Sequence, residues 1–122
     1  MNTPRLLAAW ALGLASMAAL ADAEPAKPVA GALVATNGMT LYTFDKDSAD
    51  KSACNGPCAA LWPPLMAAST DQPQGAYGIL TRDDGGRQWS YKGKPLYFYK
   101  ADLKAGDRTG DNFKEVWHIV KE

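Results

Sequence analysis

The sequence has little of what most catalytic and metal sites require, because its 122 residues include one histidine and two cysteines. A site built from several imidazoles is therefore excluded, and histidine-dependent catalysis has the single candidate His118. Net charge is absent too, since thirteen basic side chains balance thirteen acidic ones. A neutral balance argues against a protein that binds nucleic acid or a membrane surface through its overall charge.

Long apolar runs occur only at the N-terminus. Arg5 precedes an uncharged run at 6–20 that is rich in alanine and leucine, and Ala21-Asp22-Ala23 follows as an A-x-A pattern. This order is typical of a secretory signal peptide, and the run is shorter than the roughly 20 residues of a membrane-spanning helix. We therefore expect a signal peptide at 1–23, cleaved near Ala23 or Ala21, and a periplasmic or secreted protein. After cleavage we expect no membrane span, and no lipid anchor because the cleavage pattern contains no cysteine.

The rest of the chain contains an internal repeat. A gapless shift of 55 positions gives six identities, where residue usage alone gives roughly two. The identical pairs are Gly31/Gly86, Gly38/Gly93, Leu41/Leu96, Tyr42/Tyr97, Asp47/Asp102 and Trp62/Trp117. Each copy is too small to bury an apolar face alone. We expect an extended lead-in at 24–28 and one domain at 29–122, with copies at about 31–66 and 86–121.

Turn signals between short apolar runs predict β-hairpins in both copies. Asn37-Gly38 lies between runs at 32–36 and 39–44, and Lys92-Gly93 lies between runs at 87–91 and 96–99. A further strand before a second turn signal makes the second hairpin part of a three-stranded meander. These additional elements are a strand at 77–82, a turn at 83–86, a closing strand at 117–120 and helical turns at 57–61 and 112–116. The predicted fold class is mostly β: a small antiparallel β domain of tandem hairpin repeats with one or two short helical turns.

The hairpin turns also predict which side chains share a face. A two-residue turn in the first copy places Val34 opposite Leu41, and the turn in the second copy places Trp89 opposite Leu96. We expect that face to be core. The other face carries Tyr42, Phe44, Tyr97 and Tyr99. These four rings form either a second core layer or an exposed stacking surface, since half-buried strands favour aromatic residues.

The repeated strings resemble a known family. Residues 42–47 and 97–102 both match Y-x-[FWY]-x-x-D, with the motif residues Tyr42, Phe44, Asp47, Tyr97, Tyr99 and Asp102. Between them lie Cys54-Asn55-Gly56-Pro57-Cys58-Ala59 and Leu61-Trp62-Pro63-Pro64-Leu65. In combination these strings are similar to the bacterial secreted repeat of unknown function, also described as predicted lipoproteins. The resemblance implies export and a paired repeat but no reaction, and the chain differs from lipoprotein members by lacking the lipid-accepting cysteine.

The two cysteines form the first candidate site. In an exported protein two lone cysteines usually pair, so we expect a disulfide between Cys54 and Cys58. It would close a loop of five residues and stabilise the fold by about 2 kcal/mol. The alternative is a redox-active or metal-binding dithiol, although thioredoxin-type chemistry uses the shorter C-x-x-C spacing.

Acidic residues form the second candidate site. Asp45, Asp47 and Asp50 make a D-x-D-x-x-D cluster, but it fails the EF-hand pattern because position 12 is Gly56. A weak calcium site of another type, or a metal site that includes His118, stays open as the alternative. For Asp47 and Asp102 we expect carboxylates that accept hydrogen bonds from backbone N–H groups of the following loops.

The sequence contains no catalytic string such as G-x-S-x-G, H-E-x-x-H or a P-loop. We therefore expect a non-enzymatic envelope protein, a binding or structural module without a cofactor, whose partner is an unidentified envelope component or a small ligand. The alternative is a periplasmic redox or metal-handling accessory protein that uses Cys54, Cys58, His118 or the acidic cluster. A two-carboxylate hydrolase ranks third, because nothing marks a particular pair of acids.

Overall fold

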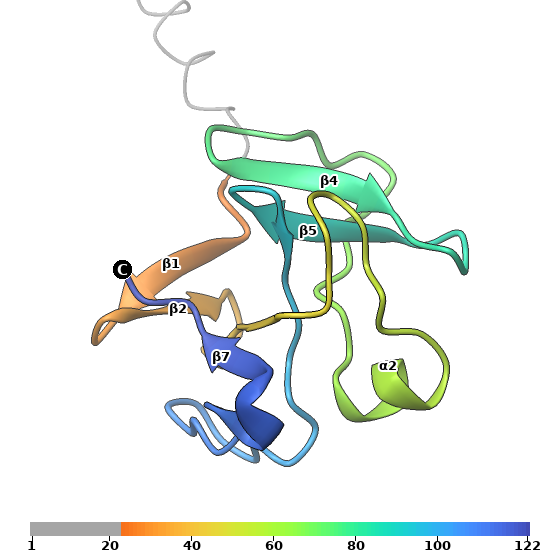
Figure 1. Ribbon diagram of the computed structural model, residues 1–122. Helices are drawn as coiled ribbons and strands as arrows, with labels where there is room; N and C mark the ends of the chain where they lie inside the picture. Colours follow the sequence, from red (N-terminus) through yellow and green to blue (C-terminus); the bar gives the residue numbers. More distant parts are fainter. Residues whose placement is uncertain (1–22) are drawn as a thin grey trace, which may run out of the picture.

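The structure is a computed structural model that describes residues 23–122. The expected signal peptide, apart from Ala23, lies outside the described residues. The described elements are β1 (Ala26–Val29), β2 (Ala32–Ala35), β3 (Tyr42–Phe44), α2 (Pro57–Leu61), β4 (Tyr77–Thr81), β5 (Arg87–Tyr91), β6 (Lys94–Pro95), the 3₁₀ turn η2 (Phe113–Glu115) and β7 (Trp117–Ile119). The strands form three antiparallel sheets in the orders β1-β2, β3-β7 and β4-β5-β6 (Figure 1). This mostly-β arrangement with short helical turns confirms the predicted fold class.

The meander of the second copy has the predicted register. Lys92 and Gly93 both have positive φ, 52° and 83°, which is the conformation that two-residue hairpin turns require. The Leu96 N–H donates to the Trp89 carbonyl at 3.0 Å, so these residues lie opposite each other as expected. Pro95 faces Ser90 at the neighbouring position, where the ladder needs no donor from the proline.

The register predicted for the first copy is wrong by one residue. Val34 lies opposite Thr40 instead of Leu41, and the Ala35 N–H donates to the Met39 carbonyl at 2.9 Å. The loop therefore holds three residues, 36–38, of which only Gly38 has positive φ. The physical reason is the Asn37 side chain, whose Oδ1 accepts the Met39 N–H at 3.0 Å and closes the turn locally.

A strand that the sequence did not reveal covers β2. Residues 26–29, most of which fall in the expected lead-in, form β1 and pair with the whole of β2. The connecting residues Ala30 and Gly31 have φ of 50° and 84°, again a two-residue hairpin turn. With this partner in place, all four residues of β2 are buried.

Two hydrophobic clusters form the core, and the consecutive residues Leu41 and Tyr42 belong to different clusters, as do Leu96 and Tyr97. The first cluster consists of Ala26, Leu33, Ala35, Leu41, Tyr77, Trp89 and Leu96. The second consists of Tyr42, Cys54, Trp62, Tyr97 and Trp117, with Phe44 and Tyr99 packed against it. Tyr42 and Tyr97 are fully buried, so these two rings belong to a second core layer and not to an exposed stacking surface, whereas Phe44 and Tyr99 are partly buried against that layer.

The two copies exchange strand partners. Tyr42 and Tyr97 face each other and exchange two backbone hydrogen bonds, of 2.8 and 3.0 Å. Tyr42 also pairs with Ile119 of the second copy, whereas Tyr97 pairs with Pro64 of the first. Because 42 and 97, like 64 and 119, are equivalent positions, the pairing is reciprocal about a local two-fold axis between the tyrosines.

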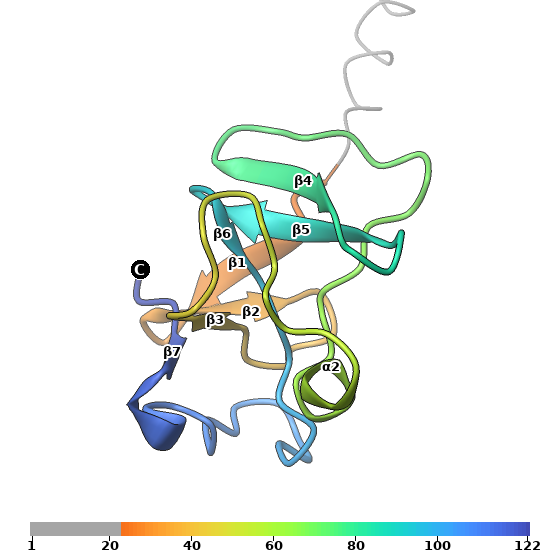
Figure 2. The ribbon, with the colours of Figure 1, turned by 45° about the vertical axis from the view of Figure 1, so that its right-hand side comes forward.

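A buried arginine attaches the disulfide loop to the meander. Arg82 is 3% exposed, and its guanidinium donates to Ser52 Oγ at 3.0 Å, Gln88 Oε1 at 3.0 Å and the Cys54 carbonyl at 2.8 Å. In both ribbon views the segment 45–55, drawn in yellow, passes close to β5 before it reaches α2 (Figures 1 and 2). The arginine thus holds the first copy's loop against the second copy's hairpin.

Candidate functional site

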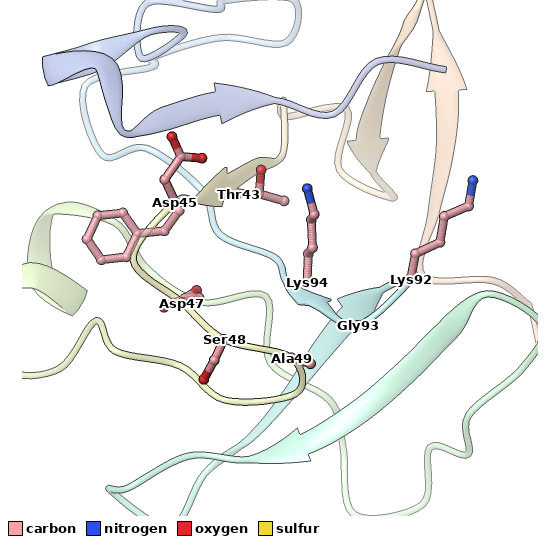
Figure 3. A pocket seen from close by; sticks show the side chains of 9 residues that line it. Thr43, Asp45, Asp47, Ser48, Ala49, Lys92, Gly93 and Lys94 are labelled. Atoms are coloured by element: carbon pink, nitrogen blue, oxygen red, sulfur yellow. The ribbon is translucent and has the colours of Figure 1, made fainter.

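A cleft of about 270 Å³ opens between the segment after β3 and the turn that joins β5 to β6. It is lined by Thr43, Phe44, Asp45, Asp47, Ser48, Ala49, Lys92, Gly93 and Lys94. Figure 3 shows Lys92 and Lys94 pointing to the same side, with Thr43 next to Lys94. Within residues 23–122, neither ammonium group lies within ion-pair distance of a carboxylate. Both lysines therefore line the cleft without an acidic ion-pair partner, and the Lys92 ammonium lies over the Tyr91 ring, 5.1 Å from its centroid.

A second hollow of about 410 Å³ continues the cleft along β7. The two share Thr43, Asp45, Lys92 and Lys94, and the second adds Tyr91, His118, Ile119, Val120, Lys121 and Glu122. His118 Nε2 lies 2.8 Å from Asp45 Oδ2, so the carboxyl group of Asp45 forms a hydrogen bond with the imidazole. The cleft therefore holds two lysines together with the carboxyl groups of Asp45 and Asp47, each of which has a hydrogen-bond partner of its own in His118 or Tyr97.

The aspartates that end the two motifs are held as expected, and each has a second partner. Asp47 Oδ1 accepts the Ala53 N–H at 2.7 Å, and Asp102 Oδ1 accepts the Thr109 N–H at 3.0 Å. The other oxygens accept phenols from the opposite copy: Tyr97 donates to Asp47 Oδ2 at 2.7 Å, and Tyr42 donates to Asp102 Oδ2 at 2.6 Å.

Burial sets the protonation of these pairs. Desolvation raises the pKa of Tyr42 far above its usual range, and the hydrogen bond to Asp102 raises it further. Desolvation likewise raises the pKa of Tyr97. It also raises the pKa of Asp47, against the opposing effect of the hydrogen bonds from Ala53 and Tyr97. Both phenols are therefore firmly protonated donors at neutral pH.

Four aromatic rings stack face to face beside the tyrosine–aspartate pairs. Trp62 and Trp117 have centroids 3.9 Å apart and an interplanar angle of 2°. Tyr99 stacks on Trp62 at 4.0 Å, and Phe44 stacks on Trp117 at 4.2 Å. We call Tyr99, Trp62, Trp117 and Phe44 the aromatic column. It repeats about the same two-fold axis, since each outer ring is the middle residue of a Y-x-[FWY]-x-x-D motif.

Of the remaining candidate sites from the sequence, the structure forms the disulfide but does not bring the acidic cluster together. The expected disulfide between Cys54 and Cys58 is confirmed, with Cα atoms 5.2 Å apart. The acidic cluster is not assembled: Asp45 contacts His118, Asp47 binds Tyr97, and Asp50 lies exposed. In the part of the chain that the structure describes, no group of three or more histidine, cysteine or acidic residues is placed to hold a metal ion.

Sequence reasoning did not identify Lys92 and Lys94 as site residues, because a lysine beside a turn glycine has no motif of its own. It did identify the Trp62/Trp117 identity within the repeat. That identity could have indicated a shared contact, since equivalent residues meet at a two-fold axis when two copies pack together.

The fold, the Tyr42–Tyr97 pairing and the aromatic column define a β protein of two interlocked, pseudo-equivalent copies. A family model described as a secreted repeat of unknown function matches residues 28–66 and 78–121, and the chain belongs to this family. The family's description as secreted agrees with the export expected from the N-terminal sequence. Searches of curated proteins and of solved structures gave no significant match. Within residues 23–122 no helix is both long and apolar enough to cross a bilayer.

Proposed function

We propose that this secreted repeat protein is a non-enzymatic binding module that holds a small anionic ligand in the cleft beside Lys92 and Lys94. One observation carries the proposal: two lysines line a common cleft, and no carboxylate of residues 23–122 lies within ion-pair distance of either ammonium group. An anion bound beside these lysines would be attracted by their positive charges and could accept charge-assisted hydrogen bonds from them.

The surroundings of the lysines fit an anion of modest size. The hydroxyls of Thr43 and Ser48 line the same cleft and offer further donors to an oxyanion. The cleft of about 270 Å³ and its neighbour of about 410 Å³ fall near the lower end of the usual range for small-molecule sites. A phosphate or a small carboxylate therefore suits the cleft better than a polymer.

Binding fits the arrangement better than acid–base catalysis. His118 Nε2 hydrogen-bonds Asp45, and among the described residues no serine or threonine hydroxyl hydrogen-bonds the imidazole. A nucleophile next to its base is the usual mark of covalent catalysis. The sulfurs of Cys54 and Cys58 are joined to each other, which leaves no dithiol for a redox-accessory role in this state.

Isothermal titration calorimetry with inorganic phosphate tests the proposal. We expect saturable binding that weakens as salt rises, because the site is exposed to solvent. Lys92→Ala and Lys94→Ala should each weaken binding by about tenfold, the effect of losing one charge-assisted hydrogen bond. Lys114→Ala is the matched control, because that lysine lies over Phe113 and does not line the cleft. Absence of saturable binding, or equal affinity in all three variants, would overturn the proposal.

A further inference from the structure

The aromatic column runs through the second core cluster. Its two central rings are buried, and its two end rings are more exposed. Trp62 and Trp117 are 3% and 4% exposed, whereas Tyr99 and Phe44 are only half-buried. All three successive ring pairs are stacked, with interplanar angles of 17°, 2° and 11°. Face-to-face stacking at these distances overlaps the π systems of neighbouring rings along the column. Isolated aromatic pairs in cores more often prefer offset or edge-to-face contacts.

Each tryptophan also touches the edge of a buried tyrosine. Tyr42 meets Trp62 at 5.4 Å, and Tyr97 meets Trp117 at 5.1 Å, both in edge geometry. The phenolic hydroxyls of these tyrosines donate to Asp102 and Asp47 at 2.6 and 2.7 Å. Tyr42 and Tyr97 thus each have a proton acceptor within hydrogen-bond reach. Tyr99, which stacks on Trp62, has no side-chain hydrogen-bond partner among the described residues.

We propose that the column is a one-electron relay, in which the Trp62–Trp117 pair is oxidised and then re-reduced by Tyr42 or Tyr97. An outer-sphere one-electron oxidant takes one electron from the stacked indoles, which share the resulting positive charge. One tyrosine then gives an electron to the indole pair, and its phenolic proton moves along the existing hydrogen bond to Asp102 or Asp47. The O–H bond of the phenol breaks and an O–H bond of the carboxylic acid forms. The products are the reduced oxidant, neutral indoles, a neutral phenoxyl radical and a neutral carboxylic acid.

The carboxylates are what distinguish this site from ordinary packing. A phenol must lose its proton when it is oxidised, and in a buried cluster solvent is not at hand to take it. Asp102 and Asp47 lie at the distance that proton transfer requires. Burial raises the pKa of Asp47, which makes its carboxylate a better proton acceptor than an exposed one. Neutral products also avoid leaving a net new charge in the core, which would be costly.

Flash oxidation of the mature protein by a photogenerated ruthenium(III) polypyridyl complex tests the relay, with transient absorption and electron paramagnetic resonance as readouts. In the wild-type protein the indole cation signal should decay into a phenoxyl signal, at a rate that does not depend on buffer-base concentration. In the double variant Asp47→Asn/Asp102→Asn the indole signal should persist, and the phenoxyl yield should fall severalfold. The double variant Tyr42→Phe/Tyr97→Phe measures the background from the other tyrosines.

Asp45→Asn is the matched control, because this carboxylate contacts His118 and no tyrosine. It should leave both signals unchanged. Where a double variant does not fold, as judged by circular dichroism, Asp102→Asn alone should shift the phenoxyl radical from Tyr42 to Tyr97. Equal phenoxyl yields in wild-type and aspartate variants, or a wild-type rate that rises with buffer base, would overturn the proposal and leave the column a packing feature.

Discussion

Tyr42 lies directly opposite Tyr97, and each tyrosine donates its phenol to the aspartate that ends the other's motif. The Y-x-[FWY]-x-x-D motif is therefore completed between copies instead of within one. The middle residues of the motifs follow the same rule, because Tyr99 stacks on Trp62 of the first copy and Phe44 on Trp117 of the second. Such mutual completion explains on physical grounds why the same residue types occur in both copies.

The phenol–carboxylate bonds should contribute measurably to stability. Tyr42→Phe should lower the free energy of unfolding by about 1.5–3 kcal/mol, because a buried hydrogen bond to a charged acceptor is lost. Tyr99→Phe is the matched control and should be nearly neutral, since its hydroxyl makes no side-chain hydrogen bond among the described residues. Urea denaturation measures both. Additive effects of Tyr42→Phe and Asp102→Asn in a double-mutant cycle would contradict the pairing.

The raised pKa of Asp47 predicts a particular dependence of stability on pH. Because burial raises the folded-state pKa above the unfolded value of about 3.9, the folded protein holds the proton more tightly. The contribution of Asp47 is fully present below the unfolded pKa and is lost as pH rises through the folded pKa. The free energy of unfolding of wild type, measured relative to Asp47→Asn, should therefore rise on acidification.

Asp83 provides a control of opposite sign for this measurement. The hydrogen bond from Lys51 lowers the pKa of the Asp83 carboxyl, so its contribution is present above the unfolded pKa and lost as pH falls through the folded pKa. Stability of wild type relative to Asp83→Asn should fall on acidification. Parallel curves for Asp47→Asn and Asp83→Asn would contradict the assignment.

Close packing around the column should make Gly110 intolerant of a side chain. A Cβ at this position would lie 2.7 Å from Trp62 and 2.8 Å from Tyr99, both rigid rings in the core. Gly110→Ala should therefore cost about 1–3 kcal/mol, as overpacking does elsewhere. Gly86→Ala should cost less, because its closest neighbour is the end of the flexible, exposed Met66 side chain. Thermal melting of the two variants makes the comparison.

Two buried serines should respond to alanine in opposite directions. Ser90 Oγ is buried without a hydrogen-bond partner, so Ser90→Ala should raise the free energy of unfolding by up to about 1 kcal/mol. Ser52 Oγ bonds Arg82 and Tyr97, so Ser52→Ala should destabilise by about 1–3 kcal/mol. Urea denaturation of both variants checks the signs, and a loss of stability in Ser90→Ala would mean that its hydroxyl has a partner.

Short-range chemistry explains which parts of the fold could be predicted. The Lys92-Gly93 turn, the meander and its register depend on a few neighbouring residues, and so does the disulfide across a five-residue loop. The register predicted for the first hairpin was wrong for an equally local reason, because the Asn37 side chain closes a longer loop than the Asn-Gly pattern implies. β1 escaped prediction because its strand character comes from β2 and not from its own short sequence.

The sequence by itself determined the export signal pattern, the two copies, the turns and the apolar residues available for the core. Only the tertiary structure decided that the copies exchange partners, that Trp62 and Trp117 stack at 3.9 Å, and that Lys92 and Lys94 share a cleft with Thr43. The physical reason is distance along the chain. Turns are set by backbone preferences of adjacent residues, whereas contacts between positions about 55 residues apart arise only when the whole chain finds the packing that buries both apolar faces at once.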